Sequence, residues 1–135
     1  MAVAAEIVRD LIVTSPYGRL LGVALEHIEP DLVRVRLPFR DDIVTIGDMV
    51  HGGAISGLID IAATAAAWSG ASPGGSPRGT TVGFSVSFLA AGRGQDLVAA
   101  ARVIRRGRTL SVCDVEVTDG SGEAVARALV TYKLG

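Results

Sequence analysis

The chain has 135 residues, of which 49% are hydrophobic and 20% are charged, and its formal net charge is -1 at pH 7. This near-neutral charge gives no general positive field for nucleic acid or anionic membranes, and a single cysteine excludes an internal disulfide. The length predicts one domain over residues 1–135, and the high apolar content predicts that part of the surface is covered by other subunits.

The N-terminal residues do not have the pattern of a secretory signal. Glu6, Arg9 and Asp10 interrupt the apolar residues there, and no basic region precedes them. The longest apolar run, Ile61–Trp68, is far shorter than the ~20 residues that a membrane-spanning helix needs. We therefore expect a soluble protein in the cytoplasm, without a membrane partner.

The first third of the chain predicts one helix and two strands. Residues 1–15 have the spacing of a short amphipathic helix, which Ser15-Pro16 is expected to end. Gly18 to Ile28 is interpreted as a weakly patterned strand. Leu32 to Leu37 alternates valine or leucine with arginine, which predicts a strand with one buried face and one wet face.

The long helical pattern of the chain lies within residues 47–68. Two stripes run along it, one apolar and one of small and polar side chains, so the helix is expected to pack between two partners. The apolar stripe holds Ile55, Leu58, Ile59, Ala62 and Ala66, and the small stripe holds Gly53, Ser56, Gly57, Asp60, Thr64 and Ala67. A run of Ser, Gly and Pro from Ser69 to Pro77 predicts a mobile loop after the helix.

Four strands are predicted after that loop. They cover Gly79–Leu89, Leu97–Arg105, Thr109–Thr118 and Glu123–Leu134. In the first of them, strict alternation places Val82, Phe84, Val86 and Phe88 on one face and Thr81, Gly83, Ser85 and Ser87 on the other. Strands joined by tight turns imply an antiparallel sheet, and one long helix then covers one of its faces, so the fold class is α+β.

The triplet His51-Gly52-Gly53 stands at the start of the long helix. Glycine there lets backbone N–H groups approach a ligand, and these amides can hold a carbonyl oxygen that becomes an oxyanion. The alternative is that Gly-Gly only makes a tight turn, with His51 as an ordinary helix-start residue.

Asp60 lies in the middle of an Ala- and Ile-rich helix with no basic residue within four positions. A carboxylate in such surroundings can act as general base or nucleophile. The alternative is a helix-surface aspartate that contacts water or is bonded to a backbone amide. His51 and Asp60 are nine positions apart, which on a helix is ~13 Å of rise and half a turn of rotation. They cannot meet within one chain, so a common site would have to be assembled from two subunits.

This spacing of His51-Gly52-Gly53 and Asp60, on a helix between two strands and four strands, resembles the PaaI-type hotdog-fold thioesterases. The resemblance covers about Gly18 to Leu134. It implies the hotdog fold, in which an antiparallel sheet wraps around one long helix, and it implies hydrolysis of acyl- or aryl-coenzyme A thioesters. By position, Asp60 would be the catalytic carboxylate, which either attacks the thioester directly or activates a water molecule. Gly52 would donate its N–H to the thioester oxygen, and His51 would help to hold the thioester end. Thr81 would lie near the attacking water. The chain departs from the family at Thr45, where an Asn or Gln is usual.

The resemblance further implies dimers with a continuous sheet, an active site shared between subunits, and pairing of dimers into homotetramers. Neither a metal nor an organic cofactor is implied. Arg105, Arg106 and Arg108, with Arg102, cluster around one predicted hairpin turn and can contact the phosphates of coenzyme A. Alternatively, they are solvated residues at a hairpin tip.

Other interpretations remain open from the sequence. A non-catalytic acyl-coenzyme A-binding module would keep the fold and lose turnover, with Thr45 as the sign of that loss. A hydratase or dehydratase of the same fold usually has Asp and His five residues apart, a spacing that this helix lacks. Asp48, His51 and Asp60 lack the tight spacing of a metal site. Cys113 shares its face with valines and is interpreted as a core or interface residue.

Overall fold

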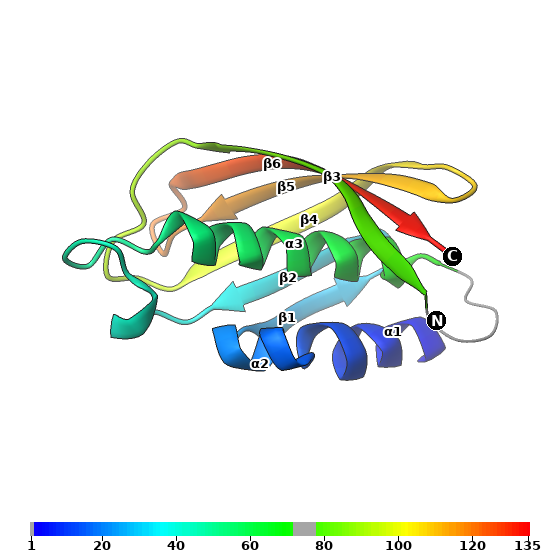
Figure 1. Cartoon of the computed structure of the whole chain (residues 1–135), viewed down its shortest axis with the longest axis horizontal. Coiled ribbons are helices and arrows are strands. Elements are labelled where there is room, and N and C mark those ends of the chain that lie inside the picture. Colours follow the sequence, from blue (N-terminus) through cyan, green and yellow to red (C-terminus); the bar gives the residue numbers. More distant parts are fainter. Residues whose placement is uncertain (1, 72–77) are drawn as a thin grey trace.

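The computed structural model of the protein describes residues 2–71 and 78–135 and shows six antiparallel strands in one sheet (Figure 1). The helical elements are α1 (Ala2–Ile7), the π-helix η1 (Val8–Val13), α2 (Pro16–Leu21), the short 3-10 helix η2 (Asp41–Ile43) and α3 (Gly52–Ser69). The strands are β1 (Ala24–Glu29), β2 (Leu32–Leu37), β3 (Gly79–Phe88), β4 (Leu97–Arg106), β5 (Leu110–Thr118) and β6 (Ala124–Leu134). Their order in the sheet is β1-β2-β4-β5-β6-β3, so β1 and β3 are its edges. Most of the predicted loop from Ser69 to Pro77 lies outside the described residues.

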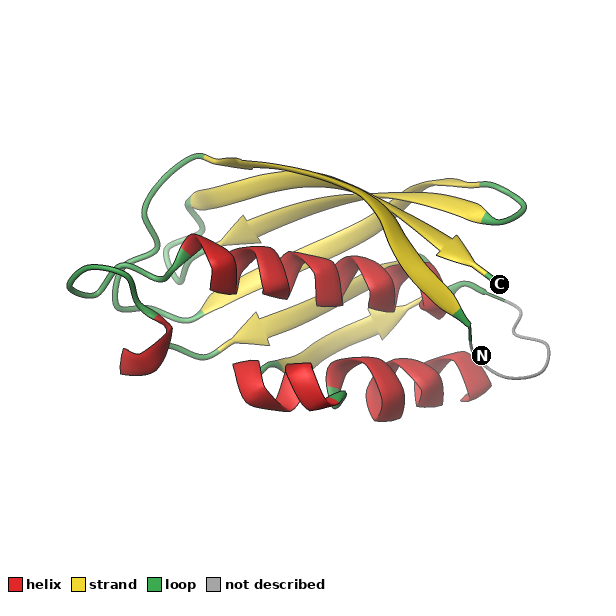
Figure 2. Cartoon of the chain, in the orientation of Figure 1, coloured by secondary structure: helices red, strands yellow, loops and turns green. Residues whose placement is uncertain are grey.

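Helix α3 lies against one face of this sheet, and the predicted α+β hotdog architecture is confirmed (Figure 2). Its apolar stripe is buried, and Leu58, Ile59 and Ala62 have no exposed surface. The stripe of small residues is left partly exposed, apart from the buried Ala67. On one side α3 contacts β3, and on the other it contacts the N-terminal helical elements (Figure 1). Asp60 therefore lies on the partly exposed face of the helix.

The predicted strand Gly18–Ile28 is wrong at its start, because the chain forms helix α2 before β1 begins at Ala24. Ser15-Pro16 ends one helical segment and also begins the next. The Ser15 side chain accepts a hydrogen bond from the N–H of Gly18 at 3.1 Å, and Pro16 takes the first helical position, where it sacrifices no hydrogen bond. Gly22 ends α2 with φ 82°, a left-handed conformation that favours glycine.

The four later strands lie within a residue or so of their predicted bounds, because their burial alternates along the chain. On β5 the side chains of Cys113, Val115 and Val117 all point into the core and have no exposed surface. The same holds for Val33 and Val35 on β2. The interpretation of Cys113 as a core residue is thus confirmed for this chain.

Strand β3 breaks the alternation that the sequence predicts for it. Its register against β6 shifts between Thr81 and Gly83, so Val82 is an extra residue that bulges from the strand. Thr81, Phe84, Val86 and Phe88 consequently oppose Tyr132, Val130, Ala128 and Ala126, whose side chains are all buried. The prediction that Thr81 faces away from these apolar residues is wrong, because the bulge rotates it to the side of the sheet that carries α3.

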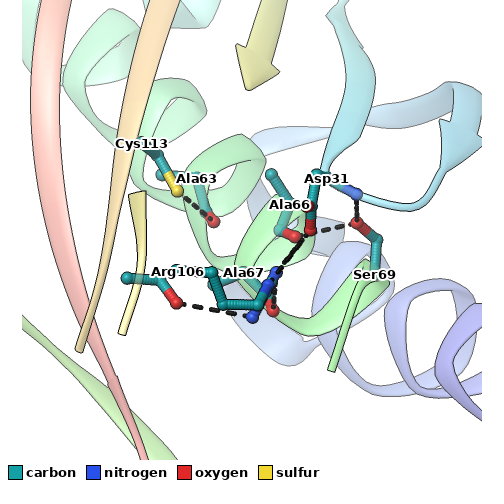
Figure 3. A network of polar contacts seen from close by, with 8 residues as sticks. Asp31, Ala63, Ala66, Ala67, Ser69, Arg106 and Cys113 are labelled. Atoms are coloured by element: carbon teal, nitrogen blue, oxygen red, sulfur yellow. Dashed lines mark hydrogen bonds and ion pairs between the residues drawn. The ribbon is translucent and has the colours of Figure 1, made fainter. Parts of the chain in front are cut away.

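The C-terminal end of α3 is fastened to the sheet by a polar network (Figure 3). The guanidinium of Arg106 donates to the carboxylate of Asp31 at 2.6 Å and to the carbonyl of Ala67 at 3.0 Å. The hydroxyl of Ser69 accepts from the N–H of Asp31 at 2.9 Å and donates to the carbonyl of Ala66 at 2.8 Å. Asp31 has φ 67°, so the β1–β2 turn is held in a conformation that costs free energy by itself. The network offsets that cost and satisfies carbonyls at the helix end.

Arg106→Gln is expected to lower the free energy of unfolding by about 1–3 kcal/mol, because it removes charge-assisted hydrogen bonds from a side chain that is only 26% exposed. Urea denaturation of the purified variant measures the change. Arg105→Gln, one residue earlier and exposed, is the matched control and should stay within about 0.5 kcal/mol of wild type. Equal stability of the two variants would contradict the structural role of Arg106.

Candidate functional site

The N-terminus of α3 is capped by a histidine. His51 occupies the N-cap position, and its Nδ1 accepts a hydrogen bond from the N–H of Gly53 at 2.7 Å. An Nδ1 that accepts carries no proton, so the neutral ring holds its proton on Nε2, and the exposed edge of the ring can donate from there. His51 is therefore both a structural cap and a hydrogen-bond donor available to a ligand.

Gly52 is the first residue of α3, where backbone N–H groups have no partner inside the helix. The next amides are used, because Gly53 donates to the His51 ring and Ala54 to the His51 carbonyl. Within residues 2–71 and 78–135, no acceptor receives the N–H of Gly52. An unpaired amide at the positive end of an 18-residue helix is suited to bind a carbonyl oxygen and to stabilise it as negative charge develops.

A pocket of about 200 Å³ adjoins this amide. It brings Thr45 together with Gly52, two residues that the sequence predicted as site residues from separate segments. The full lining consists of Thr45, Met49, Val50, Gly52, Ile55, Phe88, Ala90, Ala91 and Gly92. The apolar members were not predicted as site residues. In the sequence, Phe88 has the pattern of any apolar residue on a strand. Only its position at the end of an edge strand distinguishes it from a core residue.

Asp60 and Thr81 are brought together by the bulge in β3. The hydroxyl of Thr81 donates a hydrogen bond to the Oδ1 of Asp60 at 2.7 Å in a partly buried setting. A donated hydrogen bond orients the carboxylate and leaves its Oδ2 without a partner among the described residues. Such a carboxylate can take a proton from water or attack an electrophilic carbon.

The predicted site residues thus form two groups in one chain. We call Thr45, His51 and Gly52 the amide group, and Asp60 with Thr81 the carboxylate group. Gly52 and Asp60 are eight residues apart on α3, which corresponds to ~12 Å along the helix axis. A thioester carbonyl that accepts from Gly52 is therefore out of reach of Asp60 in the same chain.

The arginine residues of the β4–β5 hairpin lie at the opposite end of α3 from the amide group. Arg106 turns inward to Asp31 and to the carbonyl of Ala67, so its guanidinium is committed to the protein. Arg105 and Arg108 are exposed. Of the three arginine residues predicted to contact coenzyme A, Arg105 and Arg108 thus have side chains open to solvent, while Arg106 is bonded within the protein.

Two other reactive side chains do not belong to either group. Cys113 is fully buried and donates to the carbonyl of Ala63 at 3.6 Å, and burial raises the pKa of its thiol to about 11. It therefore stays a neutral thiol near pH 7 and is a poor nucleophile. Asp48 pairs with Arg93 at 3.1 Å on the surface.

The sequence model of the thioesterase superfamily matches residues 47–126, which include the carboxylate group and, of the amide group, His51 and Gly52 but not Thr45. A Deinococcus radiodurans relative that is named as an esterase is 35% identical over 116 residues, covering 85% of this chain and 76% of the relative. The medium/long-chain acyl-CoA thioesterase YigI of Escherichia coli is 26% identical, covering 89% of this chain and 86% of YigI.

Solved structures share the fold over almost the whole chain. A thioesterase family protein from Silicibacter pomeroyi has a TM-score of 0.89 and 28% identity, covering 97% of each chain. The E. coli PaaI protein from the phenylacetic acid degradation operon has a TM-score of 0.86 over 98% of this chain and 93% of its own. Its identity of 20% makes it a likeness of fold alone.

Proposed function

Because this chain belongs to the thioesterase superfamily and is a thioester hydrolase, we propose that its substrates are acyl- or aryl-coenzyme A thioesters. The observation that carries the proposal is the carboxylate of Asp60, held by Thr81 on the partly exposed face of an otherwise apolar helix. An aspartate has no packing role in that stripe of small residues. Its orientation by a donated hydrogen bond suits a carboxylate that reacts.

The proposed reaction uses water and the residues of the chain, without a metal or organic cofactor. The free Oδ2 of Asp60 takes a proton from a water molecule, and the resulting hydroxide attacks the thioester carbon. The carbonyl oxygen becomes an oxyanion that accepts a hydrogen bond from the N–H of Gly52 in a second copy of the chain. The C–S bond then breaks, and the sulfur leaves as coenzyme A thiol after taking the proton from Asp60. Alternatively, Asp60 attacks directly, and water cleaves the anhydride that forms.

Two copies of the chain complete the site in this proposal. β3 is an edge of the sheet, and its exposed side chains Val82, Phe84 and Phe88 make it an apolar edge. A two-fold axis at this edge would pair β3 with its copy antiparallel and would also reverse the direction of α3. The amide group of one subunit would then approach the carboxylate group of the other. Pairing of such dimers into a homotetramer remains a proposal from the family resemblance.

Arg105 and Arg108 are proposed to contact the phosphates of the coenzyme A part of the substrate. Changing both to Gln should raise KM for acyl-coenzyme A by about tenfold, equal to roughly 1.4 kcal/mol of binding, with little change in kcat. Phosphate contacts far from the thioester bind the ground state and the transition state equally. Steady-state kinetics, with free coenzyme A as inhibitor, measures both effects. An unchanged KM and unchanged inhibition would show that the hairpin is only solvated.

The function is tested by thiol release from a panel of acyl- and aryl-coenzyme A esters. Hydrolysis of at least one ester, at a rate that depends on Asp60, supports the thioesterase. Tight binding of esters without thiol release would instead identify a non-catalytic acyl-coenzyme A-binding module. The panel also identifies the acyl group, which the two groups of residues do not determine by themselves.

Location and other partners stay predictions from the sequence. Across residues 2–71 and 78–135, no helix has the length and apolar character that crossing a membrane would require. The expected cytoplasmic location, and the expected lack of nucleic-acid partners, follow only from composition and charge.

A further inference from the structure

A tyrosine from the N-terminal helical segment lies on the same face of α3 as Asp60. A Cβ built on Gly57 would lie only 2.5 Å from the hydroxyl oxygen of Tyr17 and 3.0 Å from its ring carbon Cε2. The ring thus reaches the backbone of α3, and it can do so because position 57 has no side chain. Tyr17 lies on α2, outside the residues 47–126 that the superfamily model matches.

The contact places the ring close to the reactive carboxylate. Gly57 and Asp60 are three residues apart on a helix, so their Cβ positions are ~5–6 Å apart on one face. Added to the 2.5 Å contact at Gly57, this puts the Tyr17 hydroxyl at most about 8.5 Å from the Cβ of Asp60. When the thioester carbon of a substrate lies at Asp60, the atoms next to that carbon can therefore reach the ring of Tyr17.

Tyr17 is also available to a ligand. Its side chain is 49% exposed, although one edge is pressed against the helix. Within the described ranges, its hydroxyl makes no hydrogen bond. An aromatic ring that is fixed by packing on one side and open on the other presents a rigid wall.

The direction of the substrate along α3 decides which part of it meets this wall. The exposed Arg105 and Arg108 lie toward the C-terminal end of α3, since their neighbour Arg106 bonds to the carbonyl of Ala67. Tyr17 and Gly57 lie on the N-terminal side of Asp60. With coenzyme A toward the arginine residues, the acyl group extends from Asp60 toward Tyr17.

We propose that Tyr17 determines acyl specificity: its ring closes the space beyond Asp60 and favours short or compact aryl acyl groups over long alkyl chains. This rests on the proposed thioesterase function. The N-terminal helical segment is then part of the active site, and Gly57 is required because any side chain there would displace the ring.

The proposal is tested with the ratio of kcat/KM for dodecanoyl-coenzyme A to that for butanoyl-coenzyme A. Tyr17→Ala should raise this ratio by ~10-fold or more, because removal of the ring opens the path for a longer chain. Tyr17→Phe, which keeps the ring, should restore the wild-type preference. Leu20→Ala is the matched control, since Leu20 is a 72% exposed apolar residue on the same helix. The midpoint of thermal unfolding identifies any change that comes from stability alone.

An unchanged ratio in Tyr17→Ala would overturn the role of Tyr17, and so would an equal rise in Leu20→Ala. Asp60→Asn, assayed with the same esters, separates this failure from that of the proposed function. If Asp60→Asn abolishes hydrolysis while the Tyr17→Ala ratio is unchanged, the thioesterase mechanism stands and only the specificity assignment fails. If Asp60→Asn keeps full activity, the proposed mechanism fails whatever the ratio shows.

Discussion

Asp60→Asn is expected to lower kcat for acyl-coenzyme A hydrolysis by about 10²- to 10⁴-fold, the usual contribution of a positioned general base. The amide has the shape of the carboxylate, and its oxygen can still accept the hydrogen bond that Thr81 donates at 2.7 Å. What it loses is the ability to take a proton or to attack carbon. Thiol release under saturating substrate measures the change.

The control for this variant is its folding. The substitution leaves the volume of the side chain unchanged on a partly exposed face, so the unfolding midpoint should stay near that of wild type. Wild-type kcat in a folded Asn variant would make Asp60 a structural residue. The mechanism proposed above would then have to be abandoned.

A mixture of His51→Ala and Asp60→Ala subunits is expected to recover about a quarter of wild-type activity, although each variant alone is nearly inactive. Random pairing makes half of the dimers mixed. In a mixed dimer, one site has both residues intact and the other has neither, so half of its sites work. The ~12 Å between the amide and carboxylate groups within one chain is the reason for this expectation.

The experiment unfolds the two variants together and refolds them, with native mass spectrometry to count mixed dimers. Each variant refolded alone is the control for activity gained by refolding itself. A single-chain site predicts no recovery, because no subunit in the mixture carries both residues. Mixed dimers that remain as inactive as the separate variants would exclude the shared site.

The central helix and the later strands could be predicted from the sequence because burial follows simple periods there. Ile55, Leu58 and Ile59 recur at helical spacing and are buried in the structure. On β5, Cys113 and its valine neighbours alternate at a period of two. A regular element that packs one face against a core carries its own conformation in its hydrophobic pattern.

Prediction failed where one residue had two local roles or where the period slipped. Ser15-Pro16 stops one helix and starts another, and the N–H of Gly18 donates a hydrogen bond to the serine hydroxyl at the start of the second. Val82 is an ordinary strand residue by composition, so nothing in the sequence marks it as the extra one. Arg106 matches its exposed neighbours, and its inward turn depends on Asp31, 75 positions away.

The amide and carboxylate groups show the same limits. Gly52 and Asp60 could be identified from local sequence, because a glycine pair before a helix and a lone carboxylate within one are local features. The contacts with Thr81, Phe88 and Tyr17 could not. Each of these contacts joins α3 to a segment that is distant in sequence. Each also depends on how that segment, the edge strand β3 or the helix α2, is rotated about its own axis.

The bulge in β3 has a consequence for comparing this chain with its relatives. One inserted residue at Val82 changes which side of the strand Thr81 faces and leaves Phe84 to Phe88 where they were. In a relative whose strand lacks the insertion, an ungapped alignment through the apolar residues would match Thr81 with a residue on the outer surface. The hydroxyl opposite the aspartate would then be found one column away. Insertion or deletion of a single residue in this edge strand is thus a short evolutionary route between sheets that present a hydroxyl to the helix and sheets that do not.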